Sequence, residues 1–153
     1  MKRSIFYSIV FILFFAGLIN VQGQMSSGDV GKTETVKDGI FIHITEGYND
    51  PHKVLMPLKM ATLMANDKDV LVYLDIHAVE LVLKSSKDLT FTKFEPMKKM
   101  LQSLIDKKVG IYVCPTCLKV AGHSEEDLMP GVQMAQKDKF FNFTKGRIIT
   151  IDY

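Results

Sequence analysis

The chain has 153 residues, of which 47% are hydrophobic and 24% are charged, with 19 basic and 17 acidic side chains. That length and apolar content suffice for one domain with a substantial core. The small net charge argues against the broad basic surface of a nucleic-acid-binding protein, so we expect no nucleic-acid partner.

Residues 1–23 have the pattern of a secretory signal peptide. Lys2 and Arg3 precede an apolar run over 5–19, and Val21 and Gly23 stand at positions −3 and −1 of a cleavage site. The alternative is a membrane anchor, but the run is shorter than the roughly 20 residues of a spanning helix. We therefore expect export, most simply to a bacterial periplasm, and no membrane segment in the mature protein. Because residues 1–23 hold two of the 19 basic residues and no acidic one, the mature chain has 17 of each.

The rest of the chain alternates between strand and helix patterns. Residues 24–38 are polar and predict a flexible lead-in to one domain over 39–153. Short apolar runs predict five strands, at 39–45, 69–76, 109–114, 131–135 and 147–153. Helical patterns separate them, at 51–66, 77–84, 94–108 and 137–145. Strands that alternate with helices and are apolar throughout predict an α/β fold, a doubly wound sheet of about five mainly parallel strands with helices on both faces.

Single residues refine two of these helices. Asp50 is a suitable N-cap for a helix whose first residue is Pro51, and Pro57 predicts an early kink or a later start. A further short helix is expected over 116–120, with Gly122 as its stop.

Candidate site residues follow the strands. Ligands of such sheets bind beyond the carboxyl ends of the strands. Tyr48, Asn49 and His52 follow the first strand and His77 follows the second, so we expect these four to line a substrate site. Asp75, near His77, is either the partner that orients a base or a solvated acid. His43, inside the first strand, is expected to be structural.

The two cysteines of the chain, Cys114 and Cys117, follow the third strand. Cys114 then lies at the start of the expected helix 116–120, where free amide donors favour a thiolate. Four interpretations remain open: a zinc site, a structural disulfide, thiol–disulfide exchange, and a nucleophilic or persulfide-carrying Cys114. Zinc is the least favoured because structural sites usually need four ligands, so we expect no metal. No GxGxxG or Walker sequence is present, so we expect no cofactor.

Four segments, "GIFIHITEGYNDPHKVLMPLKMATLM", "DVLVYLDIHAVELVL", "VGIYVCPTCLKVAGHSEEDLMPGVQ" and "KGRIITIDY", together resemble the DsrE/DsrF-like family of sulfur-relay proteins. The most specific element is a strand that ends in a cysteine, Cys114, followed eight residues later by a glycine, Gly122. The resemblance implies a flavodoxin-like sheet and a homo-oligomer, a trimer or hexamer. It also implies that Cys114 carries sulfur as a persulfide between a donor and an acceptor protein, with Cys117 as a CxxC variation. Helix 51–66 is apolar around much of its circumference, which also favours an oligomer. The alternative function is a non-catalytic ligand-binding module in which Cys114 and Cys117 form a structural disulfide.

Overall fold

The structure, a computed structural model, describes residues 35–153. The expected signal peptide and most of the expected lead-in lie outside the described residues. Eleven elements follow in chain order: β1 (Gly39–Ile44), α2 (Pro51–Met64), β2 (Asp69–Leu74), the 3₁₀-helix η1 (Ile76–Val82), α3 (Met97–Asp106), β3 (Gly110–Val113), α4 (Pro115–Val120), the 3₁₀-helix η2 (Glu125–Asp127), β4 (Val132–Met134), α5 (Lys137–Phe141) and β5 (Ile148–Asp152). Over residues 35–153, none of the helices has both the length and the apolar character that a membrane span requires.

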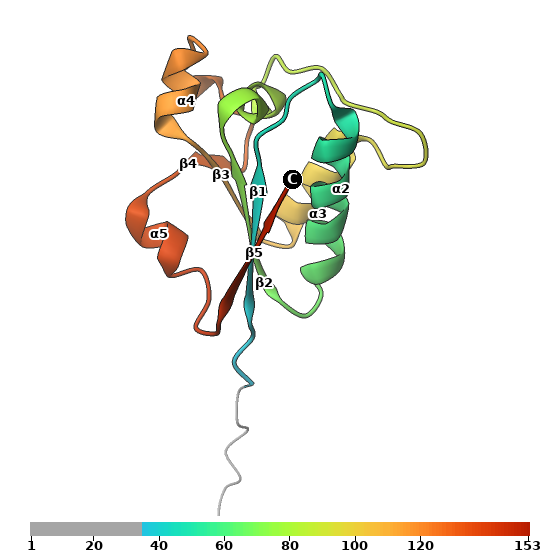
Figure 1. Ribbon diagram of the computed structural model, residues 1–153. Helices are drawn as coiled ribbons and strands as arrows, with labels where there is room; N and C mark the ends of the chain where they lie inside the picture. Colours follow the sequence, from blue (N-terminus) through green and yellow to red (C-terminus); the bar gives the residue numbers. More distant parts are fainter. Residues whose placement is uncertain (1–34) are drawn as a thin grey trace, which may run out of the picture. The chain divides into compact units, whose positions relative to one another are not determined.

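The five strands form one sheet in the order β4-β3-β2-β1-β5. Every neighbouring pair is parallel, so the carboxyl ends of all strands lie at the same edge. Helices α2 and α3 cover one face and α5 lies on the other (Figure 1). The predicted doubly wound α/β fold is confirmed.

The face under α2 and α3 holds the aliphatic core. Ile40, Ile42 and Ile44 of β1 point to this face and pack with Leu55 and Leu58 of α2, and each of these side chains is at most 5% exposed. Burying a side chain of this size stabilises the fold by roughly 1.5–3 kcal/mol. Burial on this face therefore holds α2 against the sheet.

Several predicted boundaries are corrected. Helix α2 begins at Pro51, with Asp50 accepting a hydrogen bond from the Lys53 amide, and continues through Pro57, so a later start is wrong. Pro57 is buried on the core-facing side of the helix. Helix α3 begins at Met97 rather than residue 94, because Pro96 occupies its N-cap in an extended conformation. The expected helices over 77–84 and 137–145 are a 3₁₀-helix and a five-residue helix.

Candidate functional site

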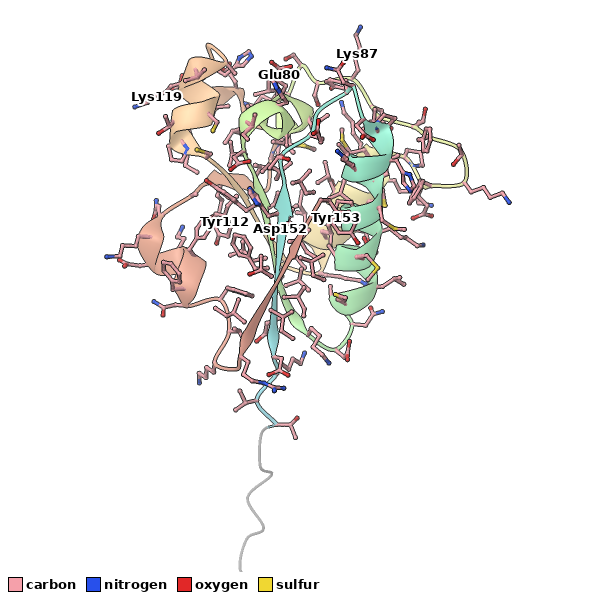
Figure 2. The ribbon with its side chains drawn as sticks, in the orientation of Figure 1. Glu80, Lys87, Tyr112, Lys119, Asp152 and Tyr153 are labelled. Atoms are coloured by element: carbon pink, nitrogen blue, oxygen red, sulfur yellow. The ribbon has the colours of Figure 1, made fainter. Side chains whose placement is uncertain are left out.

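The parallel register aligns five side chains in one row across the face opposite α2 and α3. Asp152 of β5 lies opposite His43 of β1, and His43 lies opposite Tyr73 of β2. Tyr73 lies opposite Tyr112 of β3, which is followed by Gln133 of β4. Figure 2 shows Tyr112 on the side of the sheet that carries α5. The row lies close to the carboxyl edge, two residues before Cys114.

His43 lies between two carboxylates. Its Nδ1 atom is hydrogen-bonded to Asp152 Oδ1 at 3.1 Å, and its Nε2 atom lies 3.0 Å from Asp75 Oδ2. The Asp75 contact lacks hydrogen-bond alignment, so Nε2 has no hydrogen-bond partner among the described residues. The imidazole also stacks on the Tyr73 ring, with centroids 5.5 Å apart and planes at 26°. These contacts place the His43 ring between two acidic residues and against the face of Tyr73.

Tyr73 also packs against two further aromatic residues. Phe140 of α5 meets it edge-on with centroids 4.7 Å apart, and the Phe41 ring is 6.0 Å away. Burial raises the pKa of Tyr73 above its usual range, and the neighbouring Cys114 sulfur raises it further. The phenol is therefore protonated at neutral pH and serves as a hydrogen-bond donor.

Cys114 is the N-cap of α4. Its Sγ atom accepts a hydrogen bond from the Cys117 amide at 3.4 Å. Burial raises the pKa of the Cys114 thiol, but hydrogen bonds from the Cys117 amide and thiol, the Tyr73 hydroxyl and the Thr116 amide outweigh it and leave the pKa below its ordinary value. These donors all favour the thiolate, the nucleophilic form of cysteine.

Cys117 behaves in the opposite way. The hydrogen bond to Cys114, followed by burial, raises the pKa of its thiol, although the Ile76 amide counteracts this. Both cysteines are free and partly exposed. The pair therefore consists of one sulfur prepared as a thiolate and one held as a thiol that donates to it.

The backbone on both sides of the cysteines is unusual at two residues. Ile76 has a φ of 48°, a left-handed conformation that a β-branched residue rarely adopts. Gly122 has a φ of 82° and ends α4. The Gly122 amide donates to Lys119 O, and the His123 amide donates to Leu118 O. This is a Schellman motif, so the predicted stop at Gly122 is confirmed.

The structure brings only one of the four predicted substrate-binding residues beside the cysteines. His77 and Cys117 line the same cavity, whereas Tyr48 lines a neighbouring one, and Glu80 borders both. Asn49 is exposed in the turn before α2. The ring of His52 packs on Phe91 and Phe94, at 5.7 and 5.5 Å between centroids, and lines neither cavity.

Sequence reasoning missed Tyr73 and Ile76. A signal for Tyr73 was present, because His43 and Tyr73 are each the fifth residue of a six-residue strand and break its aliphatic run. Nothing in the sequence marks Ile76, since left-handed residues are usually glycine or asparagine. Asp75 pairs with His43 rather than with a base at His77.

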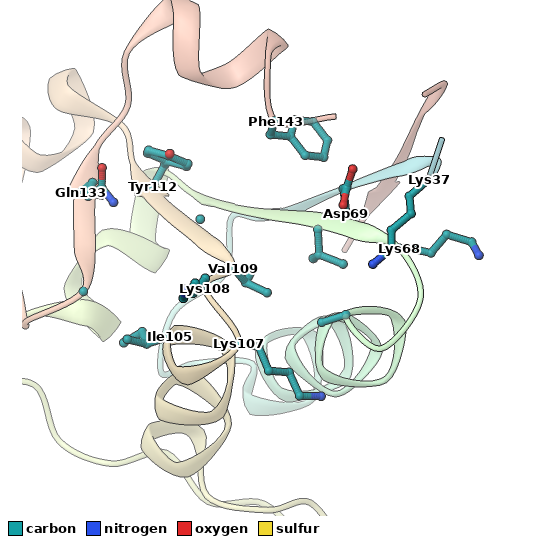
Figure 3. A pocket seen from close by; sticks show the side chains of 14 residues that line it. Lys37, Lys68, Asp69, Ile105, Lys107, Lys108, Val109, Tyr112, Gln133 and Phe143 are labelled. Carbon is teal, nitrogen blue, oxygen red and sulfur yellow. The ribbon is translucent and has the colours of Figure 1, made fainter. Parts of the chain in front are cut away.

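A third cavity, of about 580 Å³, lies at the opposite edge of the sheet, where β2, β3 and β4 begin (Figure 3). It contains four lysines, Lys37, Lys68, Lys107 and Lys108, but neither cysteine. Within residues 35–153, histidine, cysteine and acidic side chains form no group of three or more that is placed to hold a metal ion.

Comparisons with known proteins agree with the fold. A family model described as the DsrE/DsrF-like family matches residues 38–149. The ychN protein from E. coli is similar in structure, with a TM-score of 0.60 and 20% identity over 74% of this chain and 99% of that chain. MTH1491 from Methanobacterium thermoautotrophicum, a protein of unknown function, has a TM-score of 0.54 and 18% identity over 75% of this chain and 100% of that chain. A search of curated protein sequences finds no match.

Proposed function

Because the chain belongs to the DsrE/DsrF-like family, we propose that it is a sulfur carrier that holds sulfur as a persulfide on Cys114. The observation that carries this proposal is the convergence of hydrogen-bond donors on the Cys114 sulfur at the carboxyl edge of the sheet. The Tyr73 hydroxyl and the amides of Thr116 and Cys117 stabilise negative charge on the sulfur, and they would do so equally for a persulfide anion.

The loading step is a displacement at sulfur. The Cys114 thiolate attacks the outer sulfur of a donor persulfide, R–S–SH, and the S–S bond of the donor breaks. The donor leaves as a thiolate, and the outer sulfur remains on Cys114 as a persulfide. Attack by an acceptor thiolate on that sulfur reverses the chemistry and restores the Cys114 thiolate. No electrons are gained or lost overall in either direction.

Thiol–disulfide exchange is the second candidate function, and the contact between the two thiols favours it. Cys117 donates a hydrogen bond to Cys114, so after losing its proton it is placed to attack the Cys114 Sγ atom itself, which breaks the bond from Sγ to any outer sulfur. Such an attack on the persulfide would release sulfide and form a Cys114–Cys117 disulfide, which a dithiol reductant must then reopen. A purely structural disulfide in a ligand-binding module gives no role to Tyr73.

Intact mass measurement of the purified protein separates these functions. After treatment with sodium polysulfide, the Cys117→Ser protein should gain about 32 Da, the mass of one sulfur atom, and lose it with dithiothreitol. The Cys114→Ser protein should gain nothing. A loaded Cys114→Ser protein, or an unloaded Cys117→Ser protein, would contradict persulfide transport on Cys114.

We also propose export and self-assembly. Export rests on the signal pattern of residues 1–23, and N-terminal sequencing of material outside the cytoplasm should begin near Gln24.

Self-assembly into a trimer or hexamer rests on the family and on α2, where Leu63 is 52% exposed and Met56, Met60 and Met64 are only half-buried. Light scattering at micromolar concentration should give a multiple of the monomer mass, and a monomer would contradict self-assembly.

A further inference from the structure

A cavity of about 380 Å³ opens beside Cys117, between η1 and α4. Ile76, His77 and Glu80 line it from η1, and Thr116, Cys117 and Val120 line it from α4. Its volume lies at the lower end of the roughly 300–1,000 Å³ typical of small-molecule sites. The cavity therefore suits a small organic group next to Cys117, whose amide bonds to the Cys114 sulfur at 3.4 Å.

Apolar side chains stand on both sides of the cavity. Ile76 is 53% exposed and Val120 is 84% exposed, which makes them two of the most exposed large apolar residues of the described chain. Neither is covered by another part of residues 35–153. A ligand with an apolar body would remove both side chains from water, which favours its binding in proportion to the apolar surface buried.

The charge of the cavity restricts its ligand further. Glu80 is a carboxylate, His77 is the other titratable side chain of η1 that lines the wall, and no lysine or arginine is among the lining residues. Figure 2 shows Glu80 at η1, whereas Lys119 extends from the outer side of α4. An anionic ligand would therefore meet a negative charge without a compensating positive one, so the site favours a neutral or cationic molecule.

The backbone at Ile76 links this cavity to the sulfur chemistry. A left-handed conformation is unfavourable for a residue with a Cβ atom, because that atom crowds the following carbonyl oxygen. Here it is maintained by the Thr45 carbonyl, which accepts from the His77 amide at 3.1 Å, and by the Asp75 carbonyl, which accepts from the Ala78 amide at 2.8 Å. The same conformation exposes the Ile76 side chain beside the cavity and directs its amide to the Cys117 sulfur. Strain that persists beside reactive groups is a mark of a functional site.

We propose that this cavity binds the organic group of a small sulfur compound that is apolar and carries no negative charge, and so selects the donors that load Cys114. The inference rests on the proposed function, because it names the substrate class of the same site. The donor R–S–SH places its R group against Ile76 and Val120. The Cys114 thiolate attacks the outer sulfur, the S–S bond breaks, and R–S⁻ leaves and takes a proton from water.

The test uses thiosulfonate reagents, which transfer an R–S group to a thiolate and release a sulfinate. The rates of modification by a benzyl and by a sulfonatoethyl reagent are measured on the Cys117→Ser protein, in which Cys114 is the only thiol. Each rate is divided by the rate at which the same reagent modifies a small free thiol, which corrects for the intrinsic reactivity of the reagent. We expect the corrected benzyl to sulfonatoethyl ratio to exceed one by roughly tenfold, the discrimination that a small apolar pocket typically provides.

Matched variants test whether a preference for the benzyl reagent comes from the cavity. Val120→Ser and Ile76→Asn, each in the Cys117→Ser protein, should lower the ratio severalfold, and Glu80→Gln should raise the sulfonatoethyl rate. Val36→Ser removes an exposed valine that precedes β1 and lies outside the cavity lining, and it should leave the ratio unchanged. The thermal midpoint of each variant confirms that it is folded.

Two results would overturn the proposal. One is a corrected ratio near one, or a ratio that Val36→Ser changes as much as Val120→Ser does. The other is a Val120→Ser protein with an unchanged ratio and a lower mass by light scattering, which would show that a second copy covers the cavity. Sodium polysulfide carries no organic group. If it loads Cys114 while the two thiosulfonate reagents show no difference, only the proposal about the cavity is overturned. A reagent preference without polysulfide loading supports the cavity and overturns only the sulfur-carrier function.

Discussion

The two edges of the sheet each contain a cavity bordered by charged residues, but those residues are engaged differently. At the amino edge, Lys107 Nζ donates to the Thr62 carbonyl at 3.0 Å and to Asn66 Oδ1 at 2.8 Å, and Lys68 pairs with Asp67 at 2.6 Å. These lysines lie at or near the carboxyl ends of α2 and α3, where cations and donors stabilise helices. At the carboxyl edge, the donors converge on a sulfur atom instead. The size and charge of a cavity therefore say less about function than whether its polar groups are already hydrogen-bonded or paired with neighbouring residues of the fold.

The two edges also use left-handed residues for different purposes. Lys108 has a φ of 62° immediately after α3, where the Lys108 amide bonds to Ile105 O and the Val109 amide bonds to Leu104 O. That is an ordinary helix ending. Ile76 has a φ of 48° at the start of η1 and no such explanation. Strain at the amino edge thus ends a helix, whereas strain at the carboxyl edge lies beside Cys117.

Removal of the Tyr73 hydroxyl should produce the largest change at the carboxyl edge. Tyr73→Phe in the Cys117→Ser protein removes one donor to the Cys114 thiolate while it keeps the aromatic packing. We expect a higher pKa for Cys114 and alkylation at pH 7 that is slower by about three- to tenfold. Iodoacetamide kinetics measure this change. Tyr112→Phe, in the next strand of the same row, is the control, and an equal effect there would sink the role of Tyr73.

Relief of the strain at residue 76 should produce a moderate change in stability. Ile76→Gly should raise the free energy of unfolding by about 1 kcal/mol, because glycine adopts positive φ without a Cβ clash. The counterpart Lys108→Gly should stabilise to a similar extent and leave the Cys114 reactivity unchanged. Urea unfolding measures both variants. A destabilised Ile76→Gly protein would show that contacts of the isoleucine outweigh its strain.

Loss of the helix-end contacts at the amino edge should have the smallest effect. Lys107→Met removes the hydrogen bonds to Thr62 and Asn66 and should lower the thermal midpoint by only about 1–2 °C, because this lysine is exposed. The alkylation rate of Cys114 should not change. A loss of sulfur loading in this variant would mean that the amino-edge cavity takes part in function, against the contrast drawn above.

Much of the fold was predictable because its signals are local. The aliphatic runs of the strands, the cap at Asp50 with Pro51, and the stop at Gly122 each depend on residues close in the sequence. The boundaries were less predictable, since Pro96 moved the start of α3 and the segment after Asp75 formed a tighter 3₁₀-helix.

The candidate site was predictable only in its cysteines and in the edge at which they lie. The row through His43, Tyr73 and Asp152 depends on register between strands that are far apart in the sequence. Asp75 and His77 are close in sequence, but the backbone turns at Ile76 and Asp75 meets His43 instead. Contacts of this kind follow from tertiary packing, which no short sequence pattern encodes.

The alkylation rate of the Cys117→Ser protein as a function of pH tests the central claim, that the carboxyl edge prepares Cys114 as a thiolate. The rate rises with pH until the thiol is fully ionised, so a lowered pKa moves that rise to lower pH. We expect the midpoint for Cys114 to lie clearly below the ordinary cysteine value of about 8.5, and the midpoint for Cys117 in the Cys114→Ser protein to lie above that of Cys114. A midpoint for Cys114 at or above about 8.5, or faster labelling of Cys117 at pH 7, would contradict the account.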